Sequence, residues 1–313
     1  MDWADRVGRR LKLRDLHILL AVAKSGSMGK AAADLAISQP SISKAIAEVE
    51  HAVGLRLLDR GPHGIELTIY GRALLKCGVA VFDELRQGVK QLEFLTDPTA
   101  GELRIGCTET LAAGFVSAII DRLSRQYRQA TFSLVPADSL TLLNRELRQR
   151  TVEVLVTATT GLQLESDVNI EILFDDRFVV MTSARRKWIS RRNATLADLI
   201  GEPWVLPPPD SIPGRHIAEA FHASGLKPPQ PHIISFSLPL HYHMLATRRF
   251  VTMLPLSMLR FGPHLSLKQL PVNVRLNPYP IGIITLKNRT LGPLAQLFID
   301  CAREVAKPLA KRQ

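Results

Sequence analysis

Cysteine and long apolar runs are both scarce in this sequence of 313 residues. Its three cysteines, Cys77, Cys107 and Cys301, lie far apart without a CxxC pair, which excludes a disulfide framework and a zinc knuckle. We expect them to be small buried apolar residues, with a redox-sensing thiol as the alternative. No run of about twenty uncharged apolar residues occurs, so a transmembrane helix is not expected. The first apolar run, residues 18–23, is too short and too late for a secretion signal, which predicts a cytoplasmic protein.

The motifs of common enzyme classes are missing as well. The chain has no GxSxG, GxxxxGK(S/T), GxGxxG or HExxH motif, so neither catalysis nor a cofactor is predicted. Asp175 and Asp176 are adjacent, which is typical of a turn between strands and not of a catalytic pair across a cleft. His241 and His243 would share a face on a strand and diverge on a helix. Because they have no acidic or thiol partner nearby, no metal site is expected.

The share of apolar residues predicts folded domains, and the net positive charge indicates an anionic partner. Apolar residues make up 46% of the chain and charged residues 22%, which is enough for buried cores. The net charge of +11 is spread along the chain, so it supports nucleic-acid binding only weakly. A breaker-rich hinge lies at residues 96–101. We therefore predict three parts: a first domain at residues 1–68, a linker helix with its hinge at residues 69–99, and a larger domain at residues 100–313.

The first domain is predicted to begin with three short helices. The first has an apolar face at residues 13–23. Ser27 is placed to cap the second helix, residues 28–35, and Ser38 to cap the third, residues 39–51. Pro40 falls in the first turn of the third helix, where a missing N–H group costs nothing. The third helix has a predicted buried stripe of Ile42, Ala45, Ile46 and Val49.

The opposite face of the third helix carries short polar side chains at its N-terminal end. Such side chains suit a helix whose N-terminus enters the DNA major groove, because amide and hydroxyl groups contact base edges and a lysine reaches a phosphate. Residues 57–67 predict an adjacent β-hairpin with Arg60 and His63 at its tip, placed as a wing. Two helices around a tight turn also occur in bundles that never touch DNA, so spacing alone leaves both possibilities open.

Residues 13–75 closely resemble the N-terminal domain of the LysR-type transcriptional regulators. Three features depart from the family pattern: Lys44 stands where Arg is frequent, Leu58 stands where Phe is common, and Pro62 with His63 makes the wing turn atypical. The string that carries the resemblance is Leu16 to Leu20, Ala23-x-x-Gly26-Ser27, Ala31-Ala32-x-x-Leu35, Ser38-Gln39-Pro40-Ser41-Ile42-Ser43-Lys44-x-Ile46, Glu50, Gly54-Leu55-x-Leu57-Leu58-x-Arg60 and Leu67-Thr68-x-x-Gly71.

The resemblance implies a ligand-responsive transcriptional regulator that binds double-stranded promoter DNA through a winged helix-turn-helix. Gln39 and Ser41 are the best candidates for contacts to base edges, whereas Lys30, Lys44 and Arg60 are expected to contact phosphates. The full set of residues implied near DNA is Ser27, Lys30, Gln39, Pro40, Ser41, Ser43, Lys44 and Arg60.

The linker helix is predicted to start after a capping Thr68 and to end near Thr96. A helix this long cannot bury an apolar stripe within its own small domain, so pairing with a second copy is the simple solution. Packing against its own C-terminal domain is the alternative. The resemblance implies a homodimer through this helix, and a homotetramer is expected. The stripe consists of Leu74, Val81, Leu85, Leu92 and Leu95.

From Glu102 onward, short apolar strands alternate with helical patterns, which predicts an α/β domain with a mainly parallel sheet. The resemblance continues here more thinly, and it implies a fold like the periplasmic solute-binding proteins with a small-molecule effector in a cleft. Lobe one is expected at residues 100–161 and 268–313, and lobe two at residues 162–267. The matching segments are residues 101–106, 196–199, 204–206, 221–226 and 254–255.

Strand ends that face the cleft supply the predicted ligand-binding residues. Hydroxyl and free N–H groups after the first strand suit an anionic or hydroxylated ligand, whereas Glu109 argues against an anion. A small-molecule-binding protein without DNA function and an enzyme of the same α/β fold are the alternative functions. The predicted ligand-binding set is Thr108, Thr110, Asp138, Asp210, Ser211, Ser235 and Phe236.

Overall fold

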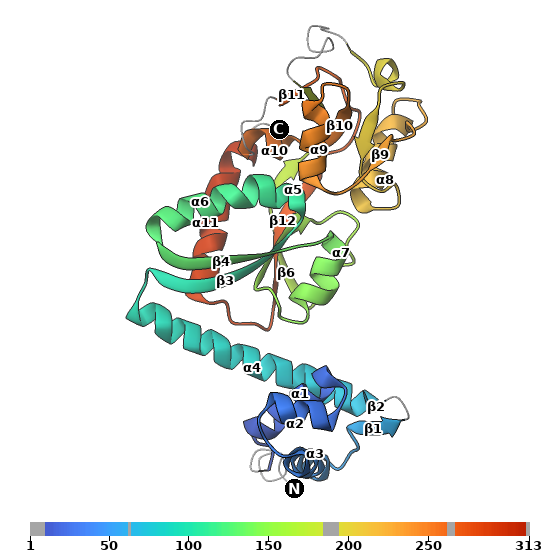
Figure 1. The fold of residues 1–313 in the computed structure, drawn as a ribbon. Coiled ribbons are helices and arrows are strands. Elements are labelled where there is room, and N and C mark those ends of the chain that lie inside the picture. The colour runs from blue at the N-terminus through green and yellow to red at the C-terminus, as the bar shows by residue number, and fades with distance from the viewer. Residues whose placement is uncertain (1–9, 62–63, 184–193, 262–266, 311–313) are drawn as a thin grey trace. The chain divides into compact units, whose positions relative to one another are not determined.

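The computed structural model describes residues 10–61, 64–183, 194–261 and 267–310 (Figure 1). The chain divides into two compact units, residues 1–88 and residues 89–313, and the boundary falls inside one long helix. The first unit contains three short helices and a β-hairpin, and the second contains two five-stranded sheets. This arrangement confirms the predicted fold class of a winged helix-turn-helix domain joined to a two-lobed α/β domain.

Three helices form the core of the first unit, as the apolar spacing predicts. The small side chain of Ala31 is fully buried, which allows the first two helices to approach closely. Ser38 caps the third helix, because its Oγ accepts a hydrogen bond from the N–H of Ser41 at 3.3 Å. Ala36, in the preceding tight turn, has a φ of 52° in the left-handed region. The helices are α1 (Leu13–Ser25), α2 (Met28–Asp34) and α3 (Gln39–Val53).

The wing is an antiparallel hairpin, as the sequence predicts. β1 (Leu58–Gly61) pairs with β2 (Gly64–Leu67), so the strand begins one residue later than expected. Leu57 lies just before it and is held by α3 instead, since Glu50 Oε1 accepts hydrogen bonds from the N–H groups of Leu57 at 2.7 Å and Leu58 at 3.2 Å. The tip residues 62–63, including the predicted wing-tip His63, lie outside the described residues.

The linker helix α4 (Ile69–Thr96) has 28 residues, or about 42 Å at ~1.5 Å per residue. Thr68 caps it as predicted, because its Oγ1 accepts from the N–H of Gly71 at 3.0 Å. Gly71 is required there, since a Cβ atom would collide with the backbone carbonyl of Leu57. Leu74 is half-buried and packs against the helix-turn-helix core. The apolar side chains left exposed on this helix are Ile69, Tyr70, Val81, Leu85, Val89, Leu92 and Leu95.

The first sheet of the C-terminal unit has the order β4-β3-β5-β12-β6. β4, β3 and β5 are parallel, and β12 runs antiparallel to both of its neighbours. Alternate residues of β5 enter different cores. Val154 and Val156 join the cluster that includes helix α11 (Pro293–Ala310), whereas Leu155 packs with Leu142, Leu143 and Leu147 on the other face. The strands are β3 (Ala100–Cys107), β4 (Gln129–Pro136), β5 (Val154–Ala158), β6 (Val168–Asp176) and β12 (Tyr279–Leu286).

Helices cover both faces of this sheet. The helix predicted at residues 111–128 is divided, because a π-helical turn at Ala112–Val116 (η2) interrupts it. A second π-helical turn, Leu142–Leu147 (η3), continues the helix predicted from residue 140. The α-helices are α5 (Glu109–Leu111), α6 (Ser117–Gln126), α7 (Ser139–Thr141) and α11 (Pro293–Ala310).

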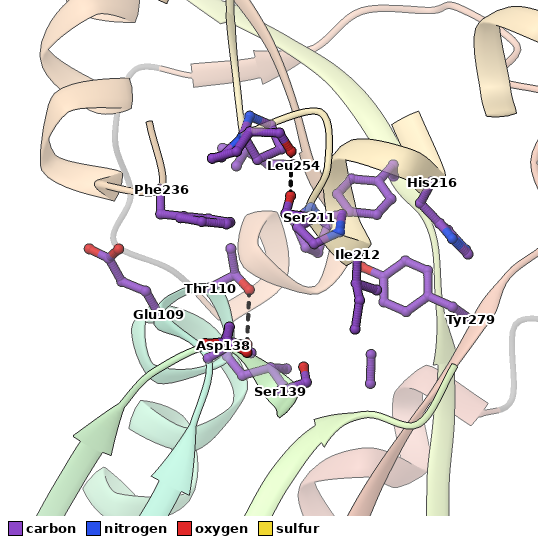
Figure 2. Close-up of a pocket in the computed structure, with 18 of the residues that line it drawn as sticks. Glu109, Thr110, Asp138, Ser139, Ser211, Ile212, His216, Phe236, Leu254 and Tyr279 are labelled. Atoms are coloured by element: carbon purple, nitrogen blue, oxygen red, sulfur yellow. Dashed lines mark hydrogen bonds between the residues drawn. The ribbon is translucent and has the colours of Figure 1, made fainter. Parts of the chain in front are cut away.

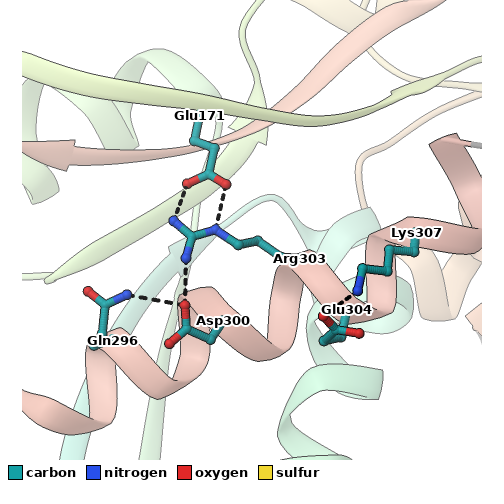
Figure 3. Close-up of polar contacts among 6 residues, drawn as sticks. All are labelled: Glu171, Gln296, Asp300, Arg303, Glu304 and Lys307. Carbon is teal, nitrogen blue, oxygen red and sulfur yellow. Dashed lines mark hydrogen bonds and ion pairs between the residues drawn. The ribbon is translucent and has the colours of Figure 1, made fainter.

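The C-terminal helix α11 is attached to the edge strand β6 by an ion pair. Arg303 donates from Nε and Nη2 to the two carboxylate oxygens of Glu171, both at 2.7 Å, and from Nη1 to Asp300 at 2.5 Å (Figure 3). The Arg303 guanidinium lowers the pKa of the Glu171 carboxyl through this hydrogen bond. Both side chains of the Arg303–Glu171 pair are about two-fifths exposed, so the pair fixes geometry more than it stabilises the fold.

The second sheet has the order β11-β7-β10-β8-β9. β10 is parallel to β8 and antiparallel to β7. Its strands are β7 (Phe178–Ser183), β8 (Trp204–Leu206), β9 (Ile233–Ile234), β10 (Val251–Pro255) and β11 (Leu267–Gln269). Its helices are the 3-10 helix η5 (Ala197–Leu199), α8 (Ile212–His222), α9 (Leu238–Ala246) and α10 (Leu256–Phe261).

Two expectations about this domain are wrong. Both sheets are mixed, because each gains antiparallel strands at the point where the chain crosses between them. The expected lobe boundary at residue 162 places β6 in lobe two, but β6 pairs with β12 in the first sheet. The chain therefore leaves the first sheet at Asp176, where β6 ends and β7 follows after Arg177.

Asp176 holds this crossover together. Its Oδ1 accepts from the N–H groups of Arg177 at 2.8 Å and Ser257 at 3.2 Å, and its Oδ2 accepts from Ser257 Oγ at 2.5 Å. The side chain is 4% exposed and joins the end of β6 to the first turn of α10. Asp176 is thus a buried connector at a strand end and not the turn residue that the sequence suggests. Burial raises its pKa, while the hydrogen bonds from Ser257 and Arg177 act in the opposite direction.

The end of the linker helix is attached to the C-terminal domain by a buried ion pair. Lys90 Nζ donates to Glu153 Oε1 at 2.6 Å and to the carbonyl of Glu102 at 2.8 Å. The side chains of Lys90 and Glu153 are 16% and 4% exposed. A charge that loses its partner in such a place has little solvent to replace it.

Replacing Lys90 with Met is expected to lower the free energy of unfolding by about 3 kcal/mol, because Glu153 would remain buried without a counter-charge. Urea denaturation of the full chain measures this change. The double variant Lys90→Met/Glu153→Leu removes both charges and should recover part of the loss. A cost below about 1 kcal/mol, the range of exposed pairs, would contradict a stabilising role.

Asp176→Asn is expected to change how stability depends on pH. A carboxyl whose pKa is raised on folding contributes most below its unfolded pKa of about 3.9, and its contribution falls as pH rises through the folded pKa. Asparagine keeps the oxygen acceptor for both N–H groups and can donate to Ser257. The wild type should therefore lose more stability than the variant between pH 4 and pH 7.5 in urea titrations. Equal losses would contradict the raised pKa.

Candidate functional sites: a helix N-terminus and an interlobe cleft

The N-terminal end of α3 presents exposed polar groups. Gln39 and Pro40 are exposed in its first turn, and Ser41 is half-buried, with its Oγ 2.8 Å from Ser38 Oγ. Lys44 is exposed one turn further along and lies 3.9 Å from Glu48. The free N–H groups and the helix dipole make this end favourable for a phosphate, and the amide of Gln39 can both donate and accept. This face can therefore contact the backbone and the base edges of a duplex.

The other DNA-contact candidates have different surroundings. Lys30 is exposed on α2, whereas Ser27 is half-buried at the N-cap of that helix without a side-chain capping bond. The hydroxyl of Ser43 is turned toward α2, where it lies 3.3 Å from Met28 Sδ. Arg60 belongs to β1, but its side chain lies outside the described residues. The side chain of Lys30 therefore faces solvent, whereas that of Ser43 connects α3 to α2.

A cavity of about 790 Å³ opens between elements of the two sheets of the C-terminal unit (Figure 2). All seven residues predicted at the cleft line it: Thr108 and Thr110 after β3, Asp138 after β4, Asp210 and Ser211 after β8, and Ser235 and Phe236 after β9. Strand ends meet at this edge because parallel strands in each sheet point the same way. Its size suits a small organic molecule.

The sequence did not indicate the apolar wall of this cavity. Tyr279 is buried in the wall, with its ring 5.2 Å from Phe178 and 5.5 Å from His216. Burial raises the pKa of Tyr279 well above its usual value, and the nearby Asp176 carboxylate adds to this. Tyr279 is remote in sequence from the other two residues, so no local motif could have grouped them. Other apolar residues that line the cavity include Ile212, Ile281, Met253 and Leu254.

Most polar side chains at the cavity already serve local structure. Asp138 Oδ1 accepts from the N–H groups of Leu140 and Thr141, both at 3.0 Å, and caps α7. Partial burial acts to raise the pKa of Asp138, but the hydrogen bonds from the Thr141 hydroxyl and these N–H groups outweigh it, so the pKa is lowered. Ser211 Oγ accepts from the N–H of Gly214 at 3.1 Å and caps α8 in the same way. These groups are acceptors that the fold has already engaged.

His241, on α9, is one of the residues that line the cavity and is 2% exposed. Its Nε2 lies 2.9 Å from the carbonyl of Ser235 and its Nδ1 lies 3.0 Å from Thr252 Oγ1. Burial lowers the pKa of His241, against the hydrogen bond to Ser235 and the charge of Glu109. His243 is exposed, so the two histidines diverge on the helix. Among the described residues, no group of three or more His, Cys, Asp and Glu side chains could hold a metal ion.

The cysteines divide into two kinds. Cys107 and Cys301 are buried as predicted, and burial raises the pKa of the Cys107 thiol to about 12. Cys77 is exposed on α4, which contradicts the expectation for that residue. No helix within the described ranges is long and apolar enough to cross a membrane.

Family models match both units of the chain. The model described as "Bacterial regulatory helix-turn-helix protein, lysR family" matches residues 13–72. The model described as "LysR substrate binding domain" matches residues 96–307, which is more than half of the chain. The exposed N-terminus of α3 lies within the first match and the interlobe cavity lies within the second.

Similar proteins are named as transcriptional regulators and not as enzymes. The uncharacterized HTH-type transcriptional regulator YdcI of Escherichia coli K12 is 27% identical over 297 residues, which cover 95% of this chain and 96% of that protein. The HTH-type transcriptional regulator GbpR of Azospirillum brasilense is 26% identical over 97% of this chain and 89% of that protein.

Solved structures share the fold. A full-length OxyR variant from Pseudomonas aeruginosa is 20% identical with a TM-score of 0.67, covering 97% of this chain and 99% of that chain. The regulator CbnR in complex with its target DNA is 19% identical with a TM-score of 0.64, covering 94% of this chain and all of that chain. Because the family models account for both units, the chain belongs to the LysR family of bacterial helix-turn-helix transcriptional regulators.

Proposed function

We propose that the N-terminal end of α3 contacts promoter DNA in the major groove. The observation that carries this proposal is the exposed first turn of that helix, where Gln39 and Pro40 face solvent beside the Ser38 cap. Gln39 and Ser41 are the base-edge candidates, and Lys30 and Lys44 are placed for phosphates. Ser43 acts through its contact with Met28 and supports the position of α3.

The interlobe cavity is the proposed effector site. All seven sequence-predicted residues line it, and Phe236 is 49% exposed at its edge, which leaves a large aromatic surface for a ligand. A ligand that contacts both sheets stabilises one arrangement of the lobes over others, which is how a small molecule shifts a regulator between states. The bound metabolite would change the assembly that holds the two DNA-binding domains.

A homodimer through α4, assembling further into a homotetramer in the cytoplasm, is the proposed form of the protein. Val81, Leu85, Val89, Leu92 and Leu95 are each at least 39% exposed on one chain. Exposed apolar residues at three- and four-residue steps are typical of a helix that pairs with a second helix. A two-fold assembly would bind an operator with two-fold symmetry.

The proposed contact of α3 with promoter DNA can be tested directly. A nuclease footprint on the DNA upstream of the gene, recorded over a salt titration, separates sequence-specific binding from binding to any DNA. Protection of a two-fold site supports the regulator, whereas sequence-independent binding that salt abolishes contradicts the proposed DNA readout.

Gln39→Ala/Ser41→Ala is expected to reduce preference for the operator over random DNA by about tenfold or more, since each lost base contact is worth ~1–3 kcal/mol. Lys30→Ala should instead weaken binding to all sequences and reduce the salt slope by about 1. Lys227→Ala, an exposed lysine in the C-terminal unit, is the matched control. An unchanged salt slope for Lys30→Ala would show that Lys30 does not contact a phosphate.

Leu85→Lys/Leu92→Lys is expected to shift the protein toward monomer in sedimentation equilibrium, because two charges would face the partner helix. Gln91→Lys, an exposed polar position on the same helix, should leave the mass unchanged. If the mass of the double variant equals that of the wild type, α4 is not the pairing surface.

A further inference from the structure

The effector cavity is acidic although the chain is basic. Four carboxylate side chains line it, and among the described lining residues Arg215 is the one with a permanent positive charge. Arg215 is exposed and its guanidinium donates to the backbone carbonyl of Asp210. An anionic effector would thus enter a cavity with several like charges and one engaged cation. The four carboxylates belong to Glu109, Asp138, Asp176 and Asp210.

The helix N-termini at the cavity already carry acceptors from the protein. Asp138 caps α7 and Ser211 caps α8. Glu109 does the same across the cleft, because its Oε1 accepts from the N–H of Leu238, the first residue of α9, at 3.2 Å. These N–H groups would be the natural partners of an effector carboxylate. Two of the three acceptors that occupy them are themselves carboxylates, which disfavours an anion further.

Glu109 has capacity for a second partner. The side chain is half-buried, and its Oε2 receives no hydrogen bond from the described residues. Phe236, two residues before Leu238, is about half exposed and lines the cavity, and Figure 2 shows Glu109 and Phe236 on the same side of it. A carboxylate beside an aromatic face is suited to an ammonium group, which gains an ion pair from one and a cation–π contact from the other.

The other side of the cavity is apolar. Phe178 and Tyr279 form an aromatic wall, with Ile212 from the start of α8. Pro207, Pro208 and Pro213 add stiff apolar surface, and Gly214 lies so close to Pro208 that a Cβ atom would collide with its carbonyl. This wall suits a compact apolar body, and the carboxylate beside it, Asp176, is already engaged by Arg177 and Ser257.

We propose that the effector is an organic cation: a protonated amine carried on a compact aromatic or branched aliphatic body. Glu109 is the counter-ion, Phe236 contacts the ammonium group, and the apolar body lies against Phe178 and Tyr279. This inference rests on the proposed function of the cavity as the effector site. It names the ligand class that the charges of that site select.

The experiment uses three probes of similar shape and different charge: 2-phenylethylamine, 2-phenylethanol and phenylacetate. Calorimetric titration into the full-length protein at pH 7.5 measures each affinity. We expect the amine to bind at least about tenfold more tightly than phenylacetate, with the alcohol between them. Glu109→Gln keeps an oxygen to accept from Leu238 and removes the charge, so it should abolish the preference for the amine.

Glu304→Gln is the matched control, since it removes the same charge on the exposed face of α11, where Lys307 pairs with it (Figure 3). That variant should keep the preference of the wild type. Of the three probes, the amine should lose the most affinity in Phe236→Ala, and this loss would place its binding site in the cavity. A preference for the amine that survives in Glu109→Gln would contradict the assigned counter-ion.

The outcomes also separate this inference from the function on which it rests. If phenylacetate binds more tightly than the amine and Phe236→Ala weakens it, the cavity is an effector site but the ligand class is wrong. If no probe binds up to 10-mM concentrations, on the order of the weakest affinities of fragment-sized ligands, the inference and the effector cavity both fail.

Discussion

The C-terminal domain depends on one buried carboxylate at the crossover between its sheets. Asp176 accepts hydrogen bonds from the backbone on both sides of the crossover and from the hydroxyl of Ser257. The end of β6, the start of β7 and the first turn of α10 are thereby fixed to a single side chain. Because the interlobe cavity opens beside this point, the position of its wall follows from the same contacts. A group that joins the two lobes and lines the cavity is well placed to respond to a ligand.

The helix caps connect fold and ligand choice in this domain. Side-chain acceptors are needed at helix N-termini because the first N–H groups have no partner within the helix. Here the acceptors come from Asp138, Ser211 and Glu109, and all three line the cavity. Residues that satisfy the backbone therefore also set the charge that a ligand meets. The same backbone arrangement with neutral caps would favour an anion.

Local patterns predicted the helix-turn-helix domain well. The spacing of Ile42, Ile46 and Val49 matches their burial, and the caps at Ser38 and Thr68 are present because capping depends on residues within one turn. Local patterns did not indicate that the Ser43 hydroxyl also contacts Met28, because that residue lies on another helix. They also failed for β6, since strand pairing with β12 joins segments about one hundred residues apart and leaves no signal in either segment alone.

The sequence by itself determined the pairing of a helix-turn-helix domain with an α/β domain, the family, the polar face of α3 and the seven strand-end residues at the cavity. Each of these follows from local periodicity, from turn chemistry or from motifs in a fixed register. Only the tertiary structure decided where the lobes divide, which residues form the aromatic wall and how the cavity is charged. Phe178, His216 and Tyr279 meet through contacts between distant segments, and the electrostatics of the cavity depend on which carboxylates converge there. These residues come together only when the chain is packed, because contacts and charge interactions both depend on distance in space.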